Sequence, residues 1–285
     1  MVNPEIYEPN RETAWCPGCG DIPLRQCLAE ALAEMELQPP QVTMFTGIGQ
    51  AAKMPHYIKV NGFNGLHGRA LPPALGMRIA NPKMKVIVES GDGDTYGEGG
   101  NHILHNIRRN PNIAHFVHDN QIYGLTKGQA SPTTGEEITT STQPNGITAR
   151  PFNPIKFAVA MGASFVARSF VGKKEHLKAM MKAAINHRGY ALIDILQPCV
   201  SFNKVNTYQW YMKRVYQLGD DYDPTSYEGA LKKSEEWGDN IPIGIIYKND
   251  EIPIFRDKHP QIADRELVKE KKKPTDFQAL IDEMK

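Results

Sequence analysis

The sequence predicts a doubly wound α/β fold with a mostly parallel sheet. Short runs of consecutive apolar residues alternate with segments whose apolar residues recur at helical spacing. Strands that are apolar on both faces are typical of a parallel sheet covered by helices on both sides. The chain has 285 residues, 40% of them hydrophobic and 23% charged, which is ordinary for a globular protein with a large core.

The predicted elements follow one another in the order that such a fold requires. Apolar runs predict strands, and the periodic segments between them predict helices. The strand candidates lie at 41–47, 85–91, 113–120, 163–170 and 191–198, and the helix candidates at 71–82, 101–110, 154–162 and 173–187. We expect these strands to share one sheet with helices on both faces.

Two parts of the chain depart from this alternation. Residues 121–153 are rich in glycine and threonine and show neither a helical nor a strand period, so we interpret them as a long functional loop. The composition changes from about residue 200. There the sequence predicts an aromatic amphipathic helix at 201–218, a late strand or edge segment at 241–248, and a charged arm or docking helix at 264–285.

The composition change suggests a division of the chain near residue 200. Residues 1–200 would form the α/β domain, preceded by a segment with two close cysteines. Residues 201–285 would form a C-terminal extension that packs on the same domain or on a partner subunit.

The charge balance and the cysteine content exclude several classes of function. Basic residues number 33 and acidic residues 32, so the formal net charge of +1 favours neither nucleic acid nor an anionic membrane. No run approaches the roughly 20 apolar residues of a membrane span, and the N-terminus lacks a signal-peptide pattern. We expect a cytoplasmic protein that binds neither nucleic acid nor membranes. Four cysteines are too few for a disulfide scaffold.

Acidic residues inside a glycine-rich turn indicate a metal that binds phosphate. The segment GDGDTYGEGGNH (91–102) follows the apolar run KVIVES and brings Asp92 and Asp94 to a predicted strand end. The next strand ends in HDNQIYG, which contains Asn120 and Ile122. Ligands of open α/β sheets bind at the carboxyl ends of strands. Asp92, the Asn120 amide and the Ile122 carbonyl are hard oxygen ligands suited to Mg²⁺, with diphosphate and water in the remaining positions.

Glycines in the same turns allow the backbone to approach phosphate closely and to donate N–H groups. These are Gly91, Gly93 and Gly124. Asp-Gly and Asn-Gln also mark ordinary turns, and that interpretation suffices for either motif alone. Both motifs together, each after a strand and with a helix between them, favour a metal–diphosphate site. A dinucleotide site is disfavoured, because acids occupy the positions where its pyrophosphate would lie.

At these residues the sequence resembles thiamine diphosphate enzymes, whose signature is a GDG at a strand end followed by a downstream Asn. More narrowly, it is similar to the β subunit of 2-oxoacid:ferredoxin oxidoreductases of the 2-oxoglutarate or pyruvate type. The motifs that carry the resemblance are WCPGCGD, TGIGQ, HGRALPPALG, GDGDTYGEGGNH, DNQIYGLTKGQASPTT and QPC, in order from residue 15 to residue 199. The resemblance implies a sheet of the thiamine diphosphate-binding type with a C-terminal extension.

The resemblance also implies roles for individual residues. Asp92, Asn120 and the Ile122 carbonyl match the Mg²⁺ ligands of the family. Its contacts with the cofactor are matched by Ile48, Gly49, Gln50, Ala51, His67, Gly93, Asp94, Gly124 and Leu125, to which we add the neighbouring Thr126. A lone histidine is also common as a structural hydrogen-bond partner, so this alternative stays open for His67.

Cys16 and Cys19 have the spacing of a zinc knuckle, a redox pair or two ligands of an iron–sulfur cluster, and spacing alone does not choose among them. The family takes two cluster ligands from this motif, one after GIG and one from a distant PC. Cys16, Cys19 and Cys199 match three of these positions, but Gln50 stands at the fourth. We expect a [4Fe-4S] cluster on the matching cysteines.

Several alternatives for the cluster remain open. Cys27, a non-cysteine side chain or a partner chain would each be able to replace the missing ligand. The remaining alternatives are a labile cluster and no cluster. Cys27 lies in the helical pattern LRQCLAEALAEM, where a cysteine usually acts as a small buried apolar residue.

The resemblance implies oxidative decarboxylation of a 2-oxo acid, with coenzyme A as acyl acceptor and ferredoxin as electron acceptor, or the reverse carboxylation. It places the glutamate that activates the cofactor on a separate α subunit, so we expect this chain to act in a heterodimer. The catalytic candidates here are His67 and Lys127. The Lys127 ammonium suits the distal carboxylate of a dicarboxylic substrate and favours 2-oxoglutarate over pyruvate, although an exposed lysine also serves solubility alone.

Two other functions fit part of this pattern. The absence of a cysteine at position 50 fits a non-redox thiamine diphosphate decarboxylase or ligase. A cofactor-binding scaffold subunit without a cluster fits as well. The aromatic residues Tyr208, Trp210 and Tyr211 are candidates for a subunit interface or for core packing.

Overall fold

The computed structural model describes residues 2–9, 11–136, 138–263, 265–271 and 277–285. The strands are β1 (Val42–Thr46), β2 (Asn61–Asn64), β3 (Lys85–Gly91), β4 (Ile113–Asp119), β5 (Phe165–Phe170), β6 (Tyr190–Leu196), β7 (Val215–Gln217) and β8 (Ile241–Lys248). The α-helices are α1 (Asp21–Glu34), α2 (Leu71–Ala80), α3 (Gly100–Arg109), α4 (Pro154–Ala160), α5 (Lys174–Asn186), α6 (Tyr208–Met212), α7 (Tyr227–Ser234) and α8 (Phe277–Glu283). The strands and helices predicted between 41 and 120 and between 154 and 198 are all present.

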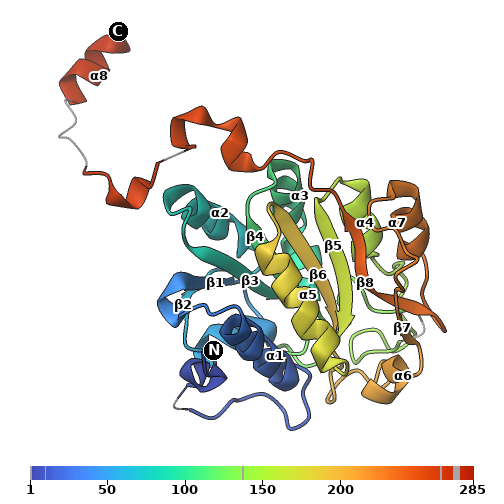
Figure 1. Cartoon of the computed structure of the whole chain (residues 1–285). Helices are drawn as coiled ribbons and strands as arrows, with labels where there is room; N and C mark the ends of the chain where they lie inside the picture. The colour runs from blue at the N-terminus through green and yellow to red at the C-terminus, as the bar shows by residue number, and fades with distance from the viewer. Residues whose placement is uncertain (1, 10, 137, 264, 272–276) are drawn as a thin grey trace.

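Within the described part of the chain, one 8-stranded sheet has the order β2-β1-β3-β4-β6-β5-β8-β7 (Figure 1). Neighbouring strands are parallel except for β5 and β8, which are antiparallel. The prediction of a doubly wound, mostly parallel sheet is therefore confirmed. Strands β2 and β7, at the two edges, were not predicted.

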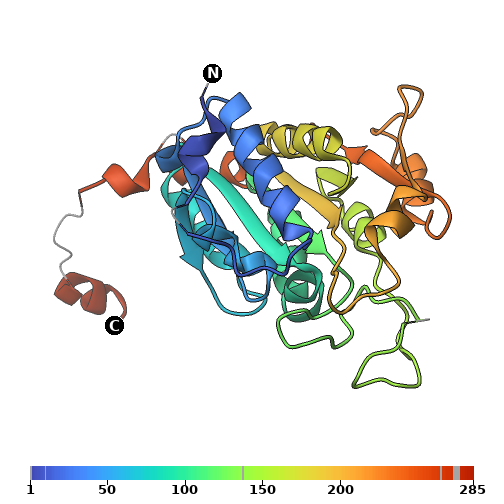
Figure 2. The ribbon, with the colours of Figure 1, turned by 90° about the horizontal axis from the view of Figure 1, so that it is seen from below.

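Two hydrophobic cores lie on opposite faces of the sheet. Helices cover both of these faces (Figures 1 and 2). Helices α1 and α5 cover one face through residues such as Leu28 and Leu177. Helices α2, α3, α4 and α7 cover the other, where Ile103 belongs to the core. The adjacent β4 residues Phe116 and Val117 belong to different cores. Because successive strand residues point to opposite faces, a strand buried on both faces has to be apolar throughout.

Local signals set the ends of the helices that flank the long loop. Asn153 caps α4 by accepting a hydrogen bond from the Lys156 N–H group, and Pro154 occupies the first helical position. Helix α3 ends at Asn110, which adopts a left-handed conformation with φ 53°. Between β4 and α4 the chain forms no named helix or strand in its described part, which agrees with the predicted loop.

Residues 201–218 do not form the continuous helix that the sequence predicted. Asn203 Oδ1 accepts hydrogen bonds from the N–H groups of Val205 and Asn206 at 3.1 and 3.0 Å. This side-chain turn competes with helix formation. The helix is therefore confined to α6, which Thr207 caps, and the chain then enters β7. Segment 241–248 is a strand, as predicted, and lies one position inside the sheet edge.

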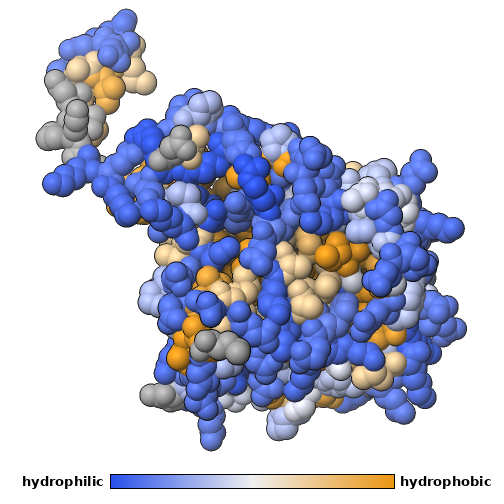
Figure 3. Space-filling view, viewed as in Figure 1, coloured by the Kyte–Doolittle hydropathy of each residue, from blue (hydrophilic) through white to orange (hydrophobic). Residues whose placement is uncertain are grey.

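The predicted aromatic residues near α6 pack in or against the core. Tyr211 is buried in the core on the side of α1 and α5, and Tyr208 and Trp210 are partly buried against it. Helix α8 projects from the body, and Phe277 and Met284 near its ends are exposed (Figure 1). The face seen in Figure 3 is mostly hydrophilic, with apolar residues in small separate areas. None of the helices in the described ranges has both the length and the apolar character needed to cross a bilayer.

Candidate active site

Two polar segments leave neighbouring strands at the carboxyl edge of the sheet. Strands β3 and β4 are parallel neighbours, and Gly91 at the end of β3 is paired with His118 near the end of β4. Asp92 directly follows β3, and Asn120 directly follows β4. The two strand ends lie side by side, so the predicted ligands leave the sheet at the same edge.

The Asp92 carboxylate is held by hydroxyl groups from the long loop. Asp92 is 2% exposed. Its Oδ2 atom accepts hydrogen bonds from Ser131 Oγ at 2.5 Å and from Thr133 Oγ1 at 2.6 Å. Thr133 Oγ1 also lies 2.8 Å from Asp119 Oδ1. A hydroxyl carries one proton, so Thr133 donates fully to only one of the two carboxylates at a time.

Negative charge accumulates around this hydroxyl. Burial raises the pKa of Asp92 and of Asp119, and for Asp119 the charges of Asp194 and Asp92 raise it further. A bound divalent cation reverses this effect, because an adjacent positive charge favours ionised carboxylates. The oxygen donors available from Asp92, Asn120 and Ile122 fit Mg²⁺ in their chemistry.

This ligand set contains a single carboxylate. Among the described residues, no group of three or more His, Cys, Asp or Glu side chains is arranged to hold a metal ion. A Mg²⁺ site built from one carboxylate, one amide oxygen, one backbone carbonyl and substrate phosphates does not need such a group.

The turn after β4 is fixed by side chains from three segments. Asn120 Oδ1 accepts a hydrogen bond from the Ile122 N–H group at 3.0 Å, and Gln121 between them is left-handed with φ 58°. Asn203 Nδ2 donates to the Asn120 carbonyl oxygen at 3.2 Å. Thr134 Oγ1 donates to the Gln121 carbonyl oxygen at 2.7 Å. The long loop and the segment after β6 therefore position the predicted ligands.

Asp94 joins two loops beside this turn. Its Oδ1 atom accepts hydrogen bonds from the N–H groups of Gly68 at 2.6 Å and Ile48 at 3.1 Å, and lies 2.8 Å from His67 Nδ1. Its Oδ2 atom is buried without a partner in the described part of the chain. A methyl group at Gly47 would lie 2.1 Å from this oxygen, so the close approach requires glycine. Three of the predicted cofactor contacts, Ile48, His67 and Asp94, thus lie together.

The other predicted cofactor contacts lie on the turns after β1, β3 and β4. A methyl group at Gly93 would lie 2.2 Å from the Tyr123 ring, and one at Gly124 would lie 3.7 Å from Gln50 Cγ. The turns after β1 and β4 therefore approach each other at Gln50 and Gly124. The remaining predicted contacts are Gly49 and Ala51 after β1, Gly91 at the end of β3, and Leu125 and Thr126 after β4.

Lys127 lies at the exposed end of the turn after β4. Its side chain is exposed, and its backbone is left-handed with φ 80°. Its N–H group donates to the Gly124 carbonyl oxygen at 3.3 Å. The left-handed backbone turns the chain sharply at this residue, and the side chain lies at the surface.

A small cavity brings together the cysteines that the sequence singled out. Its volume is about 30 Å³, and its lining includes Cys16, Cys19, Cys199 and Gln50. Ser201 Oγ donates to Cys16 Sγ at 3.1 Å, and Cys19 Sγ donates to Asp21 Oδ2 at 3.3 Å. Burial and then the charge of Asp21 raise the pKa of Cys19, which favours the neutral thiol until a metal binds. The Gln50 Oε1 atom is buried without a partner among the described residues.

Cys27 lies apart from this cavity. It is 1% exposed in the core formed by α1 and α5, and its Sγ atom is 3.7 Å from the Lys174 carbonyl oxygen. Cys27 is therefore a buried core residue, and the alternative in which it replaces the missing cluster ligand has no geometric support.

Sequence reasoning missed two groups of residues at this site. Ser131, Thr133 and Thr134 lie within the motif DNQIYGLTKGQASPTT. The sequence prediction assigns no function to the hydroxyl groups of this motif. The second group centres on His118, whose Nδ1 and Nε2 atoms lie 2.6 Å from Asp21 Oδ1 and 2.6 Å from Glu89 Oε2.

These buried residues connect the cysteine segment to the sheet. Asp21 follows the cysteine pair, whereas Glu89 and His118 belong to β3 and β4. Burial lowers the pKa of His118, but its hydrogen bonds with Asp21 and Glu89 outweigh burial and raise it to about 9. A charged imidazole is thus held between two carboxylates. No local sequence pattern predicts such a contact, because the three residues are distant in sequence.

This chain is similar to known proteins over most of its length. Residues 41–195 match the C-terminal TPP-binding domain of thiamine pyrophosphate enzymes, and residues 199–264 match the C-terminal part of the pyruvate ferredoxin oxidoreductase beta subunit. Subunit beta of 2-oxoacid:ferredoxin oxidoreductase 1 from Aeropyrum pernix is 46% identical over 248 residues, 82% of this chain and 77% of the relative. This chain belongs to the 2-oxoacid:ferredoxin oxidoreductase β subunits.

Other members of the family show the same relation. The β subunit from Saccharolobus solfataricus is 42% identical over 264 residues, 88% of this chain and 86% of the relative. A solved structure, 2-oxoglutarate:ferredoxin oxidoreductase from Magnetococcus marinus with 2-oxoglutarate, coenzyme A and succinyl-CoA bound, matches with a TM-score of 0.91 and 33% identity. The match covers 100% of this β subunit and 96% of that chain. The family resemblance and the thiamine diphosphate-binding type of fold are confirmed.

Proposed function

We propose that this β subunit, with an α subunit, oxidatively decarboxylates 2-oxoglutarate with coenzyme A to an acyl-CoA, CO₂ and reduced ferredoxin, or catalyses the reverse carboxylation. The observation that carries the proposal is the exit of Asp92 and Asn120 from neighbouring parallel strands. The substrates bound to the solved relative, 2-oxoglutarate and coenzyme A, support the proposed substrate class.

Some residues at the strand ends would bind the metal and the cofactor, and others keep these residues in position. Asp92, Asn120 and the Ile122 carbonyl would hold Mg²⁺, which would supply the positive charge that the diphosphate group of thiamine diphosphate needs. When bound, this cofactor supplies the carbanion chemistry that releases CO₂ from a 2-oxo acid. Ser131 and Thr133 keep the Asp92 carboxylate in place through their hydroxyls. Further contacts come from the backbone of the glycine-rich turns.

Asp94 mainly holds together the loops that would form the wall of the cofactor pocket. Its Oδ1 atom already accepts two backbone hydrogen bonds, from Ile48 and Gly68, and also contacts His67. Asp94 therefore sets the position of His67, whose ring we propose to face the cofactor. The partnerless Oδ2 atom of Asp94 is available to a donor from the bound molecule.

Lys127 sets the preference for a dicarboxylic substrate. Its ammonium is exposed and lies on the same turn as the proposed Mg²⁺ ligands. An ammonium pairs with the distal carboxylate of 2-oxoglutarate, whereas pyruvate offers only a methyl group at that end. The pairing orients the substrate relative to the metal site.

Cys16, Cys19 and Cys199 would hold a [4Fe-4S] cluster, which would supply electron transfer to ferredoxin. The three thiols line one cavity with Gln50, although among the described residues they are not arranged to hold a metal ion in this structure. The Gln50 side chain would supply the remaining ligand, because its Oε1 atom is buried and has no partner in the described part of the protein. Cluster binding requires thiolates, so it overcomes the burial and the negative charge that favour the neutral Cys19 thiol.

The same Gln50 favours a second candidate function. A cysteine-bound cubane as a rule takes four thiolates, and glutamine supplies none. Without a cluster the chain would be a β subunit of a non-redox thiamine diphosphate decarboxylase or ligase. The two candidates differ in the fate of the electrons left after CO₂ is released.

The test uses the α and β subunits co-expressed and purified without oxygen. The assay measures reduction of ferredoxin and release of CO₂ from 2-oxoglutarate, each with and without coenzyme A. The proposed function predicts ferredoxin reduction that depends on both 2-oxoglutarate and coenzyme A. Release of CO₂ without reduction of ferredoxin would establish the non-redox alternative.

A further inference from the structure

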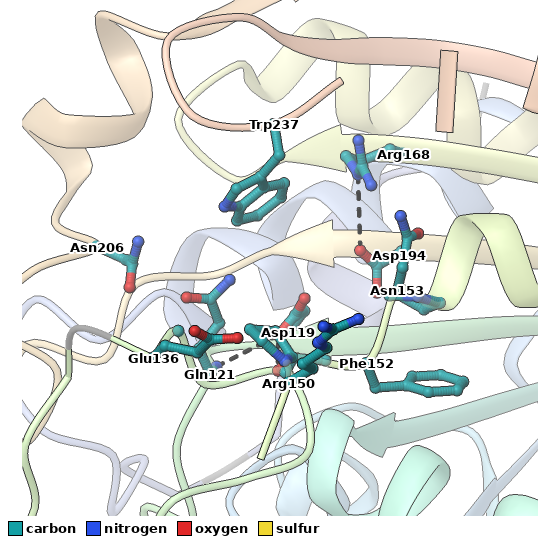
Figure 4. Close-up of a pocket in the computed structure, with 14 residues that line it drawn as sticks. Asp119, Gln121, Glu136, Arg150, Phe152, Asn153, Arg168, Asp194, Asn206 and Trp237 are labelled. Atoms are coloured by element: carbon teal, nitrogen blue, oxygen red, sulfur yellow. Dashed lines mark hydrogen bonds and ion pairs between the residues drawn. The ribbon is translucent and has the colours of Figure 1, made fainter. Parts of the chain in front are cut away.

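A second pocket lies beside the proposed Mg²⁺ site, where β4, β5 and β6 approach their carboxyl ends (Figure 4). Its volume is about 330 Å³. Small-molecule sites usually span about 300–1,000 Å³, so the pocket has room for a compact metabolite. In Figure 4, Trp237 and Arg168 lie on one side, and Asp119, Gln121 and Arg150 lie on the other.

Arg168 is enclosed in the wall of this pocket, and two of its three nitrogen atoms have no hydrogen-bond acceptor among the described residues. It is 2% exposed, and its Nε and Nη1 atoms have no hydrogen-bond partner among the residues that the structure describes. Asp194 Oδ2 lies 3.8 Å from Nε, which is beyond hydrogen-bond distance. The Trp237 ring centre lies 5.4 Å from Cζ. The Asp194 carboxylate therefore balances the charge of Arg168 as an ion pair, but two buried donors of the guanidinium stay without hydrogen bonds, which is costly.

The two buried carboxylates of the pocket, Asp119 and Asp194, in contrast, already have donors. Tyr96 Oη donates to Asp194 Oδ1 at 2.9 Å. Asp119 Oδ1 accepts from the Gln121 N–H group at 3.3 Å and lies 2.8 Å from the Thr133 hydroxyl. The unmet requirement in this pocket is therefore for an acceptor that faces Arg168. A bound cation would not supply it.

We propose that this pocket binds a small organic carboxylate whose carboxylate group accepts hydrogen bonds from Arg168. The planar carboxylate matches the planar guanidinium and forms charge-assisted hydrogen bonds with it. Arg150, exposed in the pocket wall, adds a second positive charge that offsets the exposed Glu136. The rings of Trp237 and Phe152 provide apolar surface for the carbon chain.

The pocket is distinct from the proposed catalytic substrate position. Lys127, which we assign to the catalytic substrate, does not belong to its lining. Thr133 belongs to the lining and also donates to Asp92. A carboxylate bound here is thus one hydroxyl away from the proposed Mg²⁺ ligand, and its binding does not depend on the reaction that we assign.

Binding is tested on the complex of the α and β subunits by calorimetry and by Trp237 fluorescence. The probes are 2-oxoglutarate, succinate, acetate and inorganic phosphate, each without coenzyme A. We expect saturable binding of at least one carboxylate and quenching of Trp237. Quenching of Trp237 by 2-oxoglutarate but not by succinate would identify the substrate itself as the occupant of this pocket, and quenching by succinate or acetate would identify another carboxylate.

Variants connect the binding to the pocket. The Arg168→Gln change should weaken carboxylate binding by roughly tenfold or more, because it removes a charge-assisted hydrogen bond. Since this change leaves Asp194 buried beside a neutral group, the double change Arg168→Gln with Asp194→Asn provides a neutral pair of similar shape. Trp237→Phe should abolish the fluorescence change on carboxylate binding but keep the heat of binding measured by calorimetry. Arg108→Gln, at an exposed arginine on α3, is the matched control and should bind like wild type.

Three results would overturn the proposal. The first is the absence of saturable carboxylate binding to the wild-type complex. The second is binding that is unchanged in both Arg168 variants. The third is binding of phosphate alone, which would make the pocket a phosphate site.

Discussion

The Thr133 hydroxyl oxygen lies 2.6 Å from Asp92 Oδ2, although the two residues are separated by a strand, a helix and much of a loop. The same hydroxyl lies 2.8 Å from Asp119 Oδ1. Thr133 therefore connects the ends of β3 and β4 and orients the carboxylate that we propose as a Mg²⁺ ligand. Groups that orient a metal ligand contribute strongly to metal affinity.

Removal of this hydroxyl should weaken the binding of Mg²⁺ and thiamine diphosphate. We expect Thr133→Val to reduce affinity roughly 10–100-fold, as is usual for groups that orient a metal ligand, while Thr133→Ser keeps most of it. Equilibrium dialysis of thiamine diphosphate at several Mg²⁺ concentrations measures the change. Equal affinities of the valine and serine variants would show that the hydroxyl does not orient Asp92.

The thiol cavity predicts the iron content of variants. Protein purified without oxygen should contain iron and acid-labile sulfide, and Cys199→Ser should lose them because a thiolate ligand is removed. Gln50→Cys should bind the cluster more tightly and resist air for longer, because it supplies the fourth thiolate. Cys27→Ser, in the core, is the control and should keep its iron. Zinc without iron in the wild-type protein would exclude the cluster.

His118 predicts a pH dependence of stability. Its pKa rises from an ordinary value of 6.5 to about 9 in the folded protein. A raised pKa stabilises the fold fully below about pH 6.5, and this contribution is lost as the pH rises through about 9. Burial also raises the pKa of Glu89, which likewise lowers stability at higher pH.

The measurement is urea unfolding of the wild type and of His118→Gln across this pH range. The free energy of unfolding of the wild type should fall with rising pH, and the variant should show a flatter profile. His56→Gln, at an exposed histidine, serves as the control and should follow the wild type. A wild-type profile that matches that of His118→Gln would mean that the imidazole is not charged in the fold.

Two glycines should respond in opposite ways to alanine. At Gly47 a methyl group would lie 2.1 Å from Asp94 Oδ2, and we expect Gly47→Ala to destabilise the fold by about 1–3 kcal/mol. Gly76 lies in α2 with no atom within 4 Å of the added methyl group, so Gly76→Ala should stabilise by about 0.5–1 kcal/mol. Thermal unfolding measures both. Equal effects would refute the close approach at Gly47.

Lys127 predicts substrate preference. In Lys127→Met, kcat/KM for 2-oxoglutarate should fall by roughly tenfold, the value of one charge-assisted hydrogen bond, while kcat/KM for pyruvate stays the same. Lys213→Met, at another exposed lysine, should change neither value. If the ratio of kcat/KM for 2-oxoglutarate to kcat/KM for pyruvate is unchanged in Lys127→Met, Lys127 does not set the substrate preference.

The sequence predicted the buried strands well because strands buried on both faces must be continuously apolar. The edge strands escaped prediction: NGFN in β2 is exposed and contains glycine and asparagine, and VYQ in β7 is too short to show a period. The helix predicted over 201–218 was wrong because the Asn203 side chain closes a turn that no hydrophobic pattern reveals.

Prediction of the site was limited in the same way. Asp92 and Asn120 were found because each follows an apolar run, and parallel strands present such residues at one edge. Thr133 and the contacts of His118 with Asp21 and Glu89 were missed because only the folded chain brings them together. Arg168 lies in the apolar run of β5, where no sequence pattern predicts an enclosed guanidinium.

The most direct test of the account measures thiamine diphosphate bound to the complex of the α and β subunits, with Mg²⁺ and after its removal by chelation. The wild type should retain the cofactor only with Mg²⁺. Asp92→Asn should fold normally, because burial already favours the neutral form of this side chain, but it should not retain the cofactor. Retention of thiamine diphosphate by Asp92→Asn at wild-type affinity would contradict the central claim that Asp92 holds the metal.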